Sequence, residues 1–152
     1  DATMRLVRDL GLDTAENVRV TVPEVPEDSV LELVHTPEYV KSVRAVSEDP
    51  TREIPECGLG TEDTPGYSGI HESSARLVGG SYQGAADLLS GKVVHAVSFS
   101  GGMHHAAADR ASGFCVGWTF TPSRFSRSAP PQMGNSQSER IWSSSFSVFI
   151  ER

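Results

Sequence analysis

The sequence has few cysteines, no long apolar run and no cluster of basic residues. Only two cysteines, Cys57 and Cys115, occur in 152 residues, and neither has a Cys or His at zinc-finger spacing, which argues against a disulfide framework and favours a reducing, cytoplasmic compartment. No apolar run approaches the roughly 20 residues that cross a bilayer, so we expect no membrane partner. Lys and Arg do not cluster and the net charge is −7, so we expect no nucleic-acid partner bound through a basic patch.

The composition changes sharply near Val116. Of the 20 acidic residues, 18 lie in residues 1–116, whereas residues 117–152 contain neither Asp nor Lys and hold 9 Ser. The apolar residues of this tail follow no helical or strand period for long, except around Phe146–Ile150. We therefore expect one domain over residues 1–116 and a tail over residues 117–152 that lacks a fixed structure.

Apolar periodicity predicts alternating helices and strands in the first 116 residues. Helices are expected over residues 3–10, 28–34 and 70–89 and from Pro37 onward, and strands over residues 18–22 and 93–99. The last of these strands is almost continuously apolar, as in a buried parallel strand. The pattern indicates an α/β domain, whose ligands lie at the carboxyl ends of strands. The loop that follows residue 98 is therefore where chemistry is expected.

That loop contains two adjacent imidazoles, His104 and His105, after the flexible pair Gly101-Gly102. Imidazole titrates near neutral pH, so one ring can accept a proton while its neighbour donates one. Adjacent side chains rarely point at one ion, and no nearby Asp, Glu or Cys completes a metal site. An acid–base role is therefore favoured over metal ligation.

The other candidates have structural interpretations when each is taken alone. Phe114 fits a core aromatic or the wall of an apolar channel, and Cys115 fits a buried small hydrophobe better than a nucleophile. Asp63, in the Gly- and Pro-rich stretch 50–69, fits a solvated turn. His71 and His95 fit surface positions or core histidines with satisfied hydrogen bonds.

Together, five segments resemble the zinc-dependent deacetylases of the histone deacetylase and acetoin-utilisation family. In order they read VHTPEYV (34–40), GTEDTP (60–65), GGS (79–81), GGMHHA (101–106) and ASGFC (111–115). The resemblance covers about residues 3–116, and the last two segments are its most specific part. It implies the three-layer α/β fold with a central parallel sheet that arginases and deacetylases share, incomplete in this chain.

The resemblance also implies roles for individual residues. His104 and His105 match the tandem histidines that activate a zinc-bound water and handle the proton of the leaving amine. Asp63 matches the rim carboxylate that holds the backbone amides of the substrate. Gly113 and Phe114 match the walls of a narrow channel for an acyl-lysine chain. The implied substrate is an acyl-lysine peptide or a small acylated amine, and the implied cofactor is zinc.

The resemblance stops after Val116. Where the family continues with a Tyr-Asn-Asp type sequence, an apolar helix and an Asp-x-His zinc motif, no Asp follows Asp109 and no His follows His105. The family's zinc ligands and its later catalytic Tyr therefore have no counterpart. Codons GGN-TGG-ACN for Gly117–Thr119, read from the third base, encode Asp after an NTG codon. A change of reading frame near Val116 would explain such a tail.

The sequence thus predicts a fragment of a zinc-dependent deacetylase that is inactive as this chain. The alternative is a non-catalytic module that binds acyl groups. A weaker rival is a metal-free hydrolase that uses Cys115 with His104 or His105.

Overall fold

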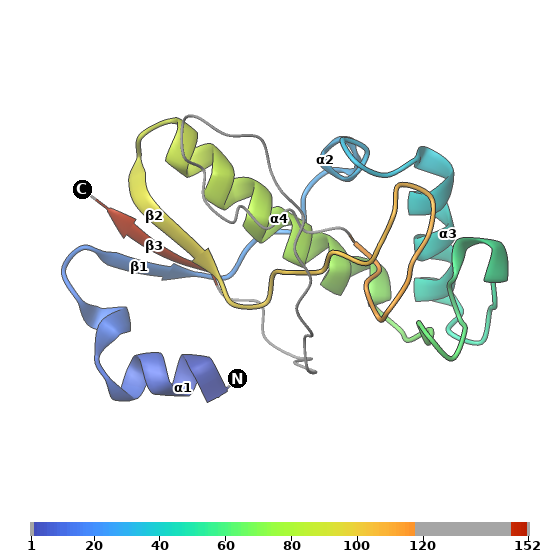
Figure 1. The fold of residues 1–152 in the computed structure, drawn as a ribbon, viewed down its shortest axis with the longest axis horizontal. Helices are drawn as coiled ribbons and strands as arrows, with labels where there is room; N and C mark the ends of the chain where they lie inside the picture. The colour runs from blue at the N-terminus through green and yellow to red at the C-terminus, as the bar shows by residue number, and fades with distance from the viewer. Residues whose placement is uncertain (1, 118–146, 152) are drawn as a thin grey trace.

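The computed structural model describes residues 2–117 and 147–151, in which a small sheet and a helix-and-loop region are joined by one long helix (Figure 1). The elements in order are α1 (Ala2–Asp9), the 3₁₀ helix η1 (Leu12–Thr14), β1 (Val18–Thr21), α2 (Asp28–Leu31), α3 (Pro37–Glu48), the 3₁₀ helix η2 (Pro55–Cys57), α4 (Ile70–Leu89), β2 (Val93–Ser98) and β3 (Ser147–Glu151). Within these ranges no helix has both the length and the apolar character needed to cross a membrane.

Strand β3 lies between β1 and β2 and pairs antiparallel with both. β1 and β2 therefore run in the same direction without pairing with each other. β2 is an edge strand of this sheet, in which Val93 is buried but Val94 and Val97 are 39% and 42% exposed. The expectation of a buried parallel strand over residues 93–99 is therefore wrong. An apolar run shows that a strand can be buried, whereas its neighbours decide whether it is.

Part of the tail belongs to this sheet. The expectation that all of residues 117–152 lack a fixed structure does not hold for residues 147–151, which form β3. This segment contains β-branched and aromatic residues, and pairing on both sides satisfies its backbone groups. The rest of that expectation, on residues 118–146 and 152, lies outside the described residues.

Helix α4 contacts elements of both regions, and a small residue in it lets the chain between β1 and α2 pass close to the helix. A Cβ atom on Gly79 would lie 2.4 Å from the carbonyl oxygen of Glu24, so only glycine allows the β1–α2 connection to cross the helix there. The helix is preceded by Gly69 and followed by Ser90 and Gly91, and both glycines have positive φ. α4 packs along β2 and also contacts α2 and α3 (Figure 1).

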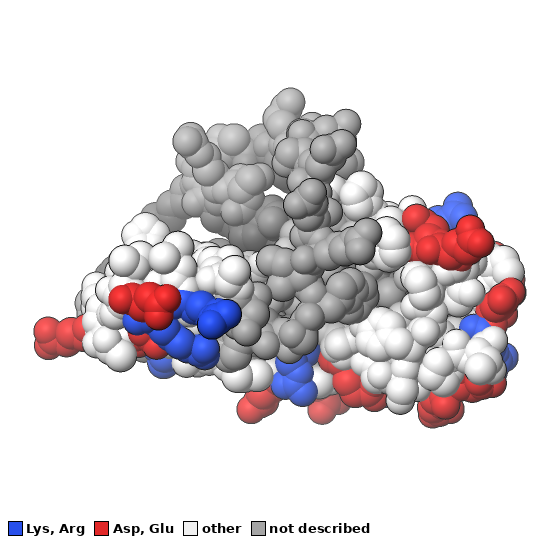
Figure 2. Space-filling model, turned by 90° about the horizontal axis from the view of Figure 1, so that it is seen from below, with Lys and Arg blue, Asp and Glu red and all other residues white. Residues whose placement is uncertain are grey.

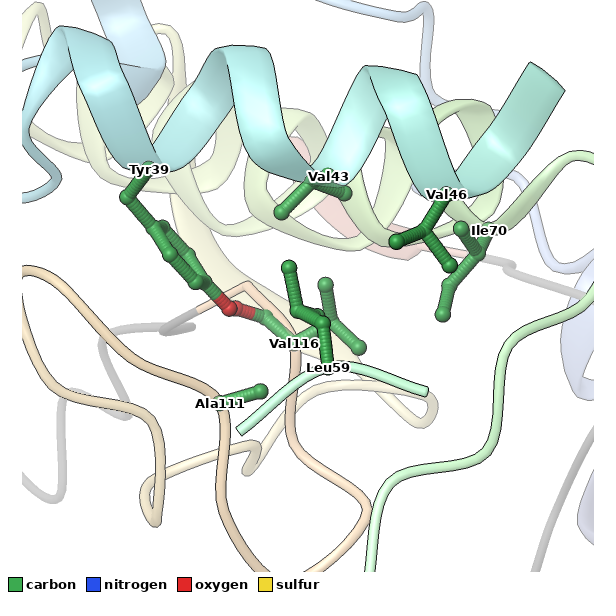
Figure 3. Close-up of a cluster of buried hydrophobic side chains, with 7 residues drawn as sticks. All are labelled: Tyr39, Val43, Val46, Leu59, Ile70, Ala111 and Val116. Carbon is green, nitrogen blue, oxygen red and sulfur yellow. The ribbon is translucent and has the colours of Figure 1, made fainter. Parts of the chain in front are cut away.

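A buried apolar cluster lies between α3 and the loops that pack on it (Figure 3). The helix begins after Thr36, whose hydroxyl accepts a hydrogen bond from the N–H of Tyr39, and Pro37 occupies its first turn. One face of α3 then contributes to the cluster, which comprises Tyr39, Val43, Val46, Leu59, Ile70, Ala111 and Val116. The cluster therefore fixes α3 against the loops on both sides of α4 in the sequence.

Candidate functional site

The amino-terminal end of α3 holds both ends of the segment that follows the histidine pair, residues 106–116. The N–H of Thr36 donates to the carbonyl of Ala108 at 2.8 Å. One helical turn later, the hydroxyl of Tyr39 donates to the carbonyl of Val116 at 2.8 Å, and Figure 3 shows that it points at this residue. Sequence reasoning missed this anchoring role, because the contacts join residues more than 70 positions apart.

A second anchor comes from the loop that follows α3. The N–H of Ala111 donates to the carbonyl of Cys57 at 2.8 Å. At the next residue, Gly58, an added Cβ would lie only 2.3 Å from the carbonyl oxygen of Ala111. The close approach of these two backbones therefore depends on glycine at position 58.

Between these anchors, Ser112 to Cys115 form a tight two-residue turn. Two backbone hydrogen bonds join Ser112 and Cys115, at 3.1 and 2.8 Å. The central residues, Gly113 and Phe114, have φ of +54° and +61°, as a type I′ turn requires. Among the described residues Phe114 is the one non-glycine with positive φ, a conformation that bulky residues rarely adopt.

Asp63 holds this turn from the loop between η2 and α4. Its carboxylate oxygen Oδ2 accepts a hydrogen bond from the N–H of Gly113 at 2.6 Å. Its carbonyl accepts a second one from the N–H of Phe114 at 3.1 Å. Asp63 is exposed, but it is tied to the two residues that the resemblance places in the channel wall.

The histidine pair lies beside the turn. The rings of His104 and His105 are exposed, with centroids 4.3 Å apart and planes tilted by 35°. Nδ1 of His104 lies 2.7 Å from the carbonyl oxygen of Gly102. A carbonyl can only accept, so neutral His104 carries its proton on Nδ1 and leaves Nε2 as the basic atom. A Cβ on Gly113 would lie 3.1 Å from Cγ of His105, so this ring packs directly on the turn.

The structure thus joins His105, Gly113, Phe114 and Asp63 through contacts, with His104 stacked on His105. Cys115 is instead buried, at 3% exposure, and its sulfur lies 3.6 Å from the sulfur of Met103. A nucleophilic thiol has to be reachable by its substrate, so this burial counts against a hydrolase that uses Cys115.

The family model of the histone deacetylase domain matches residues 1–117, which contain all of these contacts. The chain belongs to the histone deacetylase family. It is 40% identical over 99 residues to the acetoin utilization protein AcuC of Bacillus subtilis (strain 168), covering 64% of this chain and 26% of that protein. It is 32% identical over 116 residues to AcuC of Staphylococcus xylosus, covering 75% and 30%. The chain therefore spans less than a third of the length of these curated relatives.

A solved structure supports the same conclusion for the fold. The crystal structure of an HDAC homologue complexed with SAHA matches with a TM-score of 0.50 and 21% identity, over 63% of this chain and 26% of that one. The family and the α/β deacetylase fold expected from the motifs are confirmed, and the fold is present here in part.

The described part of this deacetylase-family chain does not offer a donor set for zinc. No three His, Cys, Asp or Glu side chains in residues 2–117 and 147–151 gather closely enough to hold a metal ion. His104 and His105 can therefore hold and move protons, but the contacts around them do not complete a metal site.

Two further histidines, His35 and His71, are buried in the interior of this family member. Burial lowers the pKa of His35, an effect that the nearby carbonyls of Ala107 and Ala108 partly offset. His71 is 3% exposed, and neither ring nitrogen has a hydrogen-bond partner among the described residues. His71 is therefore a core histidine, as one of the two interpretations expected, but without the satisfied hydrogen bonds expected of it. His95 is exposed, as the other interpretation expected.

The end of the molecule that carries α3 has an acidic surface. Acidic side chains gather at the end of the molecule that carries α3 and the loop after it (Figure 2). Those of the stretch 48–63 are all exposed and comprise Glu48, Asp49, Glu53, Glu56, Glu62 and Asp63. Such a surface favours cationic over anionic partners.

Proposed function

We propose that this chain supplies the histidine pair and the substrate-facing rim of a zinc-dependent deacetylase that hydrolyses acyl-lysine-type amides, and that it is inactive by itself. The observation that carries the proposal is the joint placement of Asp63, Gly113, Phe114 and His105 inside the region that matches the family. In this arrangement an exposed base stands beside an aromatic wall and a carboxylate, as amide hydrolysis along a lysine-sized channel requires.

The residues have distinct roles in the proposal. With its Nδ1 proton held by the Gly102 carbonyl, His104 offers Nε2 as a proton acceptor, and His105 beside it can return a proton to the leaving amine. Asp63 accepts N–H groups of the substrate backbone, and Gly113 with Phe114 flanks the acyl-lysine chain. The acidic surface favours the approach of lysine-rich peptides.

Inactivity of the chain follows from what these residues lack. They can move a proton and shape a channel, but they do not hold the zinc that the family's chemistry implies. The family match ends at residue 117, and the sequence after it contains neither Asp nor His. Both facts support a change of reading frame near Val116, after which the metal ligands of the family are absent.

The test compares two proteins on an acetyl-lysine peptide: the 152-residue chain, and a version in which the frame after Val116 is corrected and the chain extended through the zinc ligands. We expect no turnover by the chain with or without added zinc, and zinc-dependent turnover by the extended version. His104→Ala or His105→Ala in the extended version should lower kcat about 10²-fold or more, as for loss of a general base. Zinc-dependent turnover by the chain would contradict the proposed inactivity, and an inactive extension would contradict the proposed reaction.

A second function, binding of acyl groups without turnover, is favoured by one observation. The turn and the Asp63 carboxylate are joined by hydrogen bonds of the chain itself. Saturable binding of the acetyl-lysine peptide to the inactive chain, lost in Phe114→Ala but kept in the matched surface variant Tyr82→Ala, would support this function. Equal weak binding of an unacetylated peptide would exclude it.

A further inference from the structure

We infer that Asp63 is a positioning residue for the histidine pair, which it orients through the Gly113–Phe114 turn. The inference rests on the proposed function only for the statement that His105 handles a proton. It adds an internal task to the residue that the resemblance assigns to the substrate alone.

The first step is the hold that Asp63 has on the turn. It accepts hydrogen bonds from two consecutive N–H groups, with Oδ2 for Gly113 and its carbonyl for Phe114. The first of these is charge-assisted and, at 2.6 Å, short, which marks the stronger class of hydrogen bond. Phe114 needs such a hold because its positive φ is unfavourable for a non-glycine residue.

The second step leads from the turn to the imidazole. At Gly113 a Cβ would lie 3.1 Å from Cγ of His105 and 3.3 Å from its Cβ and Cδ2. The backbone of the turn therefore forms one wall against which the His105 ring rests. Because His104 and His105 are stacked, a shift of the turn would also reach His104.

The third step concerns the other carboxylate oxygen. Among the described residues, Oδ1 of Asp63 has no hydrogen-bond partner, and the side chain is exposed. One carboxylate can therefore hold the turn with Oδ2 and receive an N–H of a bound peptide with Oδ1. Peptide binding and the orientation of His105 would then be coupled through a single residue.

The experiment uses NMR on the labelled 152-residue chain, so that no readout depends on turnover. In Asp63→Ala we expect amide hydrogen exchange of Gly113 to accelerate on the order of tenfold, as for loss of a charge-assisted hydrogen bond. The N–H of Phe114 keeps its acceptor, the backbone carbonyl of residue 63, and should change less. The His105 ring Cδ2–Hδ2 signal should move, whereas that of the distant, exposed His95 should stay. Asp63→Asn should restore most of the parent signals, because its carbamoyl oxygen can still accept from Gly113.

The matched control is Glu62→Ala, which removes the same charge from the neighbouring exposed position. It should leave the Gly113 exchange and the His105 signal unchanged. An Asp63→Ala variant with the parent's amide exchange and the parent's His105 signal would overturn the inference, and so would an equal effect of Glu62→Ala.

If Asp63→Ala fails to fold, the variants Asp63→Asn and Gly113→Ala test the inference instead. The first should keep the His105 signal, and the second should move it, because its methyl group meets the ring. The opposite result in either variant would overturn the inference. Because these readouts do not require turnover, the test can fail while the proposed function holds, and the reverse.

Discussion

Glycine 58 shows at the scale of one residue how the site segment is held. Its φ is +70°, and a Cβ there would lie 2.3 Å from the carbonyl oxygen of Ala111. Gly91, after α4, has nearly the same φ of +72°, but nothing lies within 4 Å of its added Cβ. The two positions share the cost of a left-handed backbone and differ only in the space beside it.

This difference predicts unequal effects of the same substitution. Gly91→Ala should lower the free energy of unfolding by about 1–2 kcal/mol, the cost of the left-handed conformation alone. Gly58→Ala should lower it by about 1–3 kcal/mol more, because backbone must move to relieve the overlap. Urea denaturation of both variants measures the difference, and equal losses would contradict the described approach of residue 58 to Ala111.

His71 predicts a pH dependence of stability. Burial, and then the nearby charge of Arg44, lower the pKa of this imidazole, against the weaker opposing effects of Glu72 and Asp28. The nearest acidic atom, Oε1 of Glu72, is 4.0 Å from Nδ1, beyond hydrogen-bond distance. Below about pH 6.5 the imidazole is therefore protonated in the unfolded chain but still neutral in the folded chain. The free energy of unfolding falls as the pH falls toward the lowered pKa.

Replacing this imidazole should remove part of that dependence. His71→Phe should be nearly as stable at pH 5 as at pH 7, apart from the contribution of His35, whose pKa burial lowers in the same direction. The exposed His95→Phe serves as the control and should keep the parent's loss of stability. Urea midpoints at the two pH values provide the measurement, and a parent-like loss in His71→Phe would show that His71 is not its source.

At the scale of elements, α3 is the support of the segment that carries the turn. Burial raises the pKa of the Tyr39 hydroxyl, so the group stays protonated and donates to the Val116 carbonyl at neutral pH. Together with the Thr36–Ala108 contact, this hydrogen bond fixes both ends of a segment whose middle is held by Asp63. The helix and the loop before α4 thus hold the same segment through separate contacts.

Removing one hydroxyl should show how much this support contributes. In Tyr39→Phe the Val116 carbonyl stays buried without its donor, which should cost about 1–3 kcal/mol of unfolding free energy. Tyr82→Phe removes the same atom from a side chain that is 48% exposed and should change stability little. Thermal or urea unfolding compares the pair, and similar small losses would mean that the Tyr39 hydrogen bond is not significant.

The elements that sequence patterns predicted well are those set by local contacts. Periodicity predicts a helix over residues 70–89, which form α4, and a helix from Pro37, where α3 begins. The errors concern contacts between distant segments. The exposure of β2 depends on its neighbours in the sheet, and β3 lies in a stretch with only brief periodicity. The same holds for the site, where Asp63 contacts Gly113, 50 residues away in the sequence. Periodicity reports only local structure and therefore cannot predict this contact.

At the scale of the whole molecule, the proposed site lies in the part of the chain that matches the family. The histidine pair, the Gly113–Phe114 turn and the Asp63 carboxylate lie within residues 1–117 and are joined by direct contacts. The sequence after residue 117 offers two Glu but no Asp, His or Cys. Whatever the tail does, it does not repeat the donor types that the resemblance implies for zinc.

Zinc retention is therefore a test at this scale that does not require turnover. A structural or catalytic zinc site needs about three protein ligands, and a pair of adjacent imidazoles supplies at most a weak, solvent-exposed contact. Because no three donors gather in the described residues, we expect the chain to lose added zinc on dialysis at neutral pH against a weak chelator. Elemental analysis of the dialysed protein measures this, with His104→Ala and the exposed His95→Ala as paired variants. Near-stoichiometric zinc that survives dialysis of the parent and of His95→Ala, and is lost from His104→Ala, would show that the pair belongs to a metal site after all. It would also remove the physical basis for expecting this chain to be inactive.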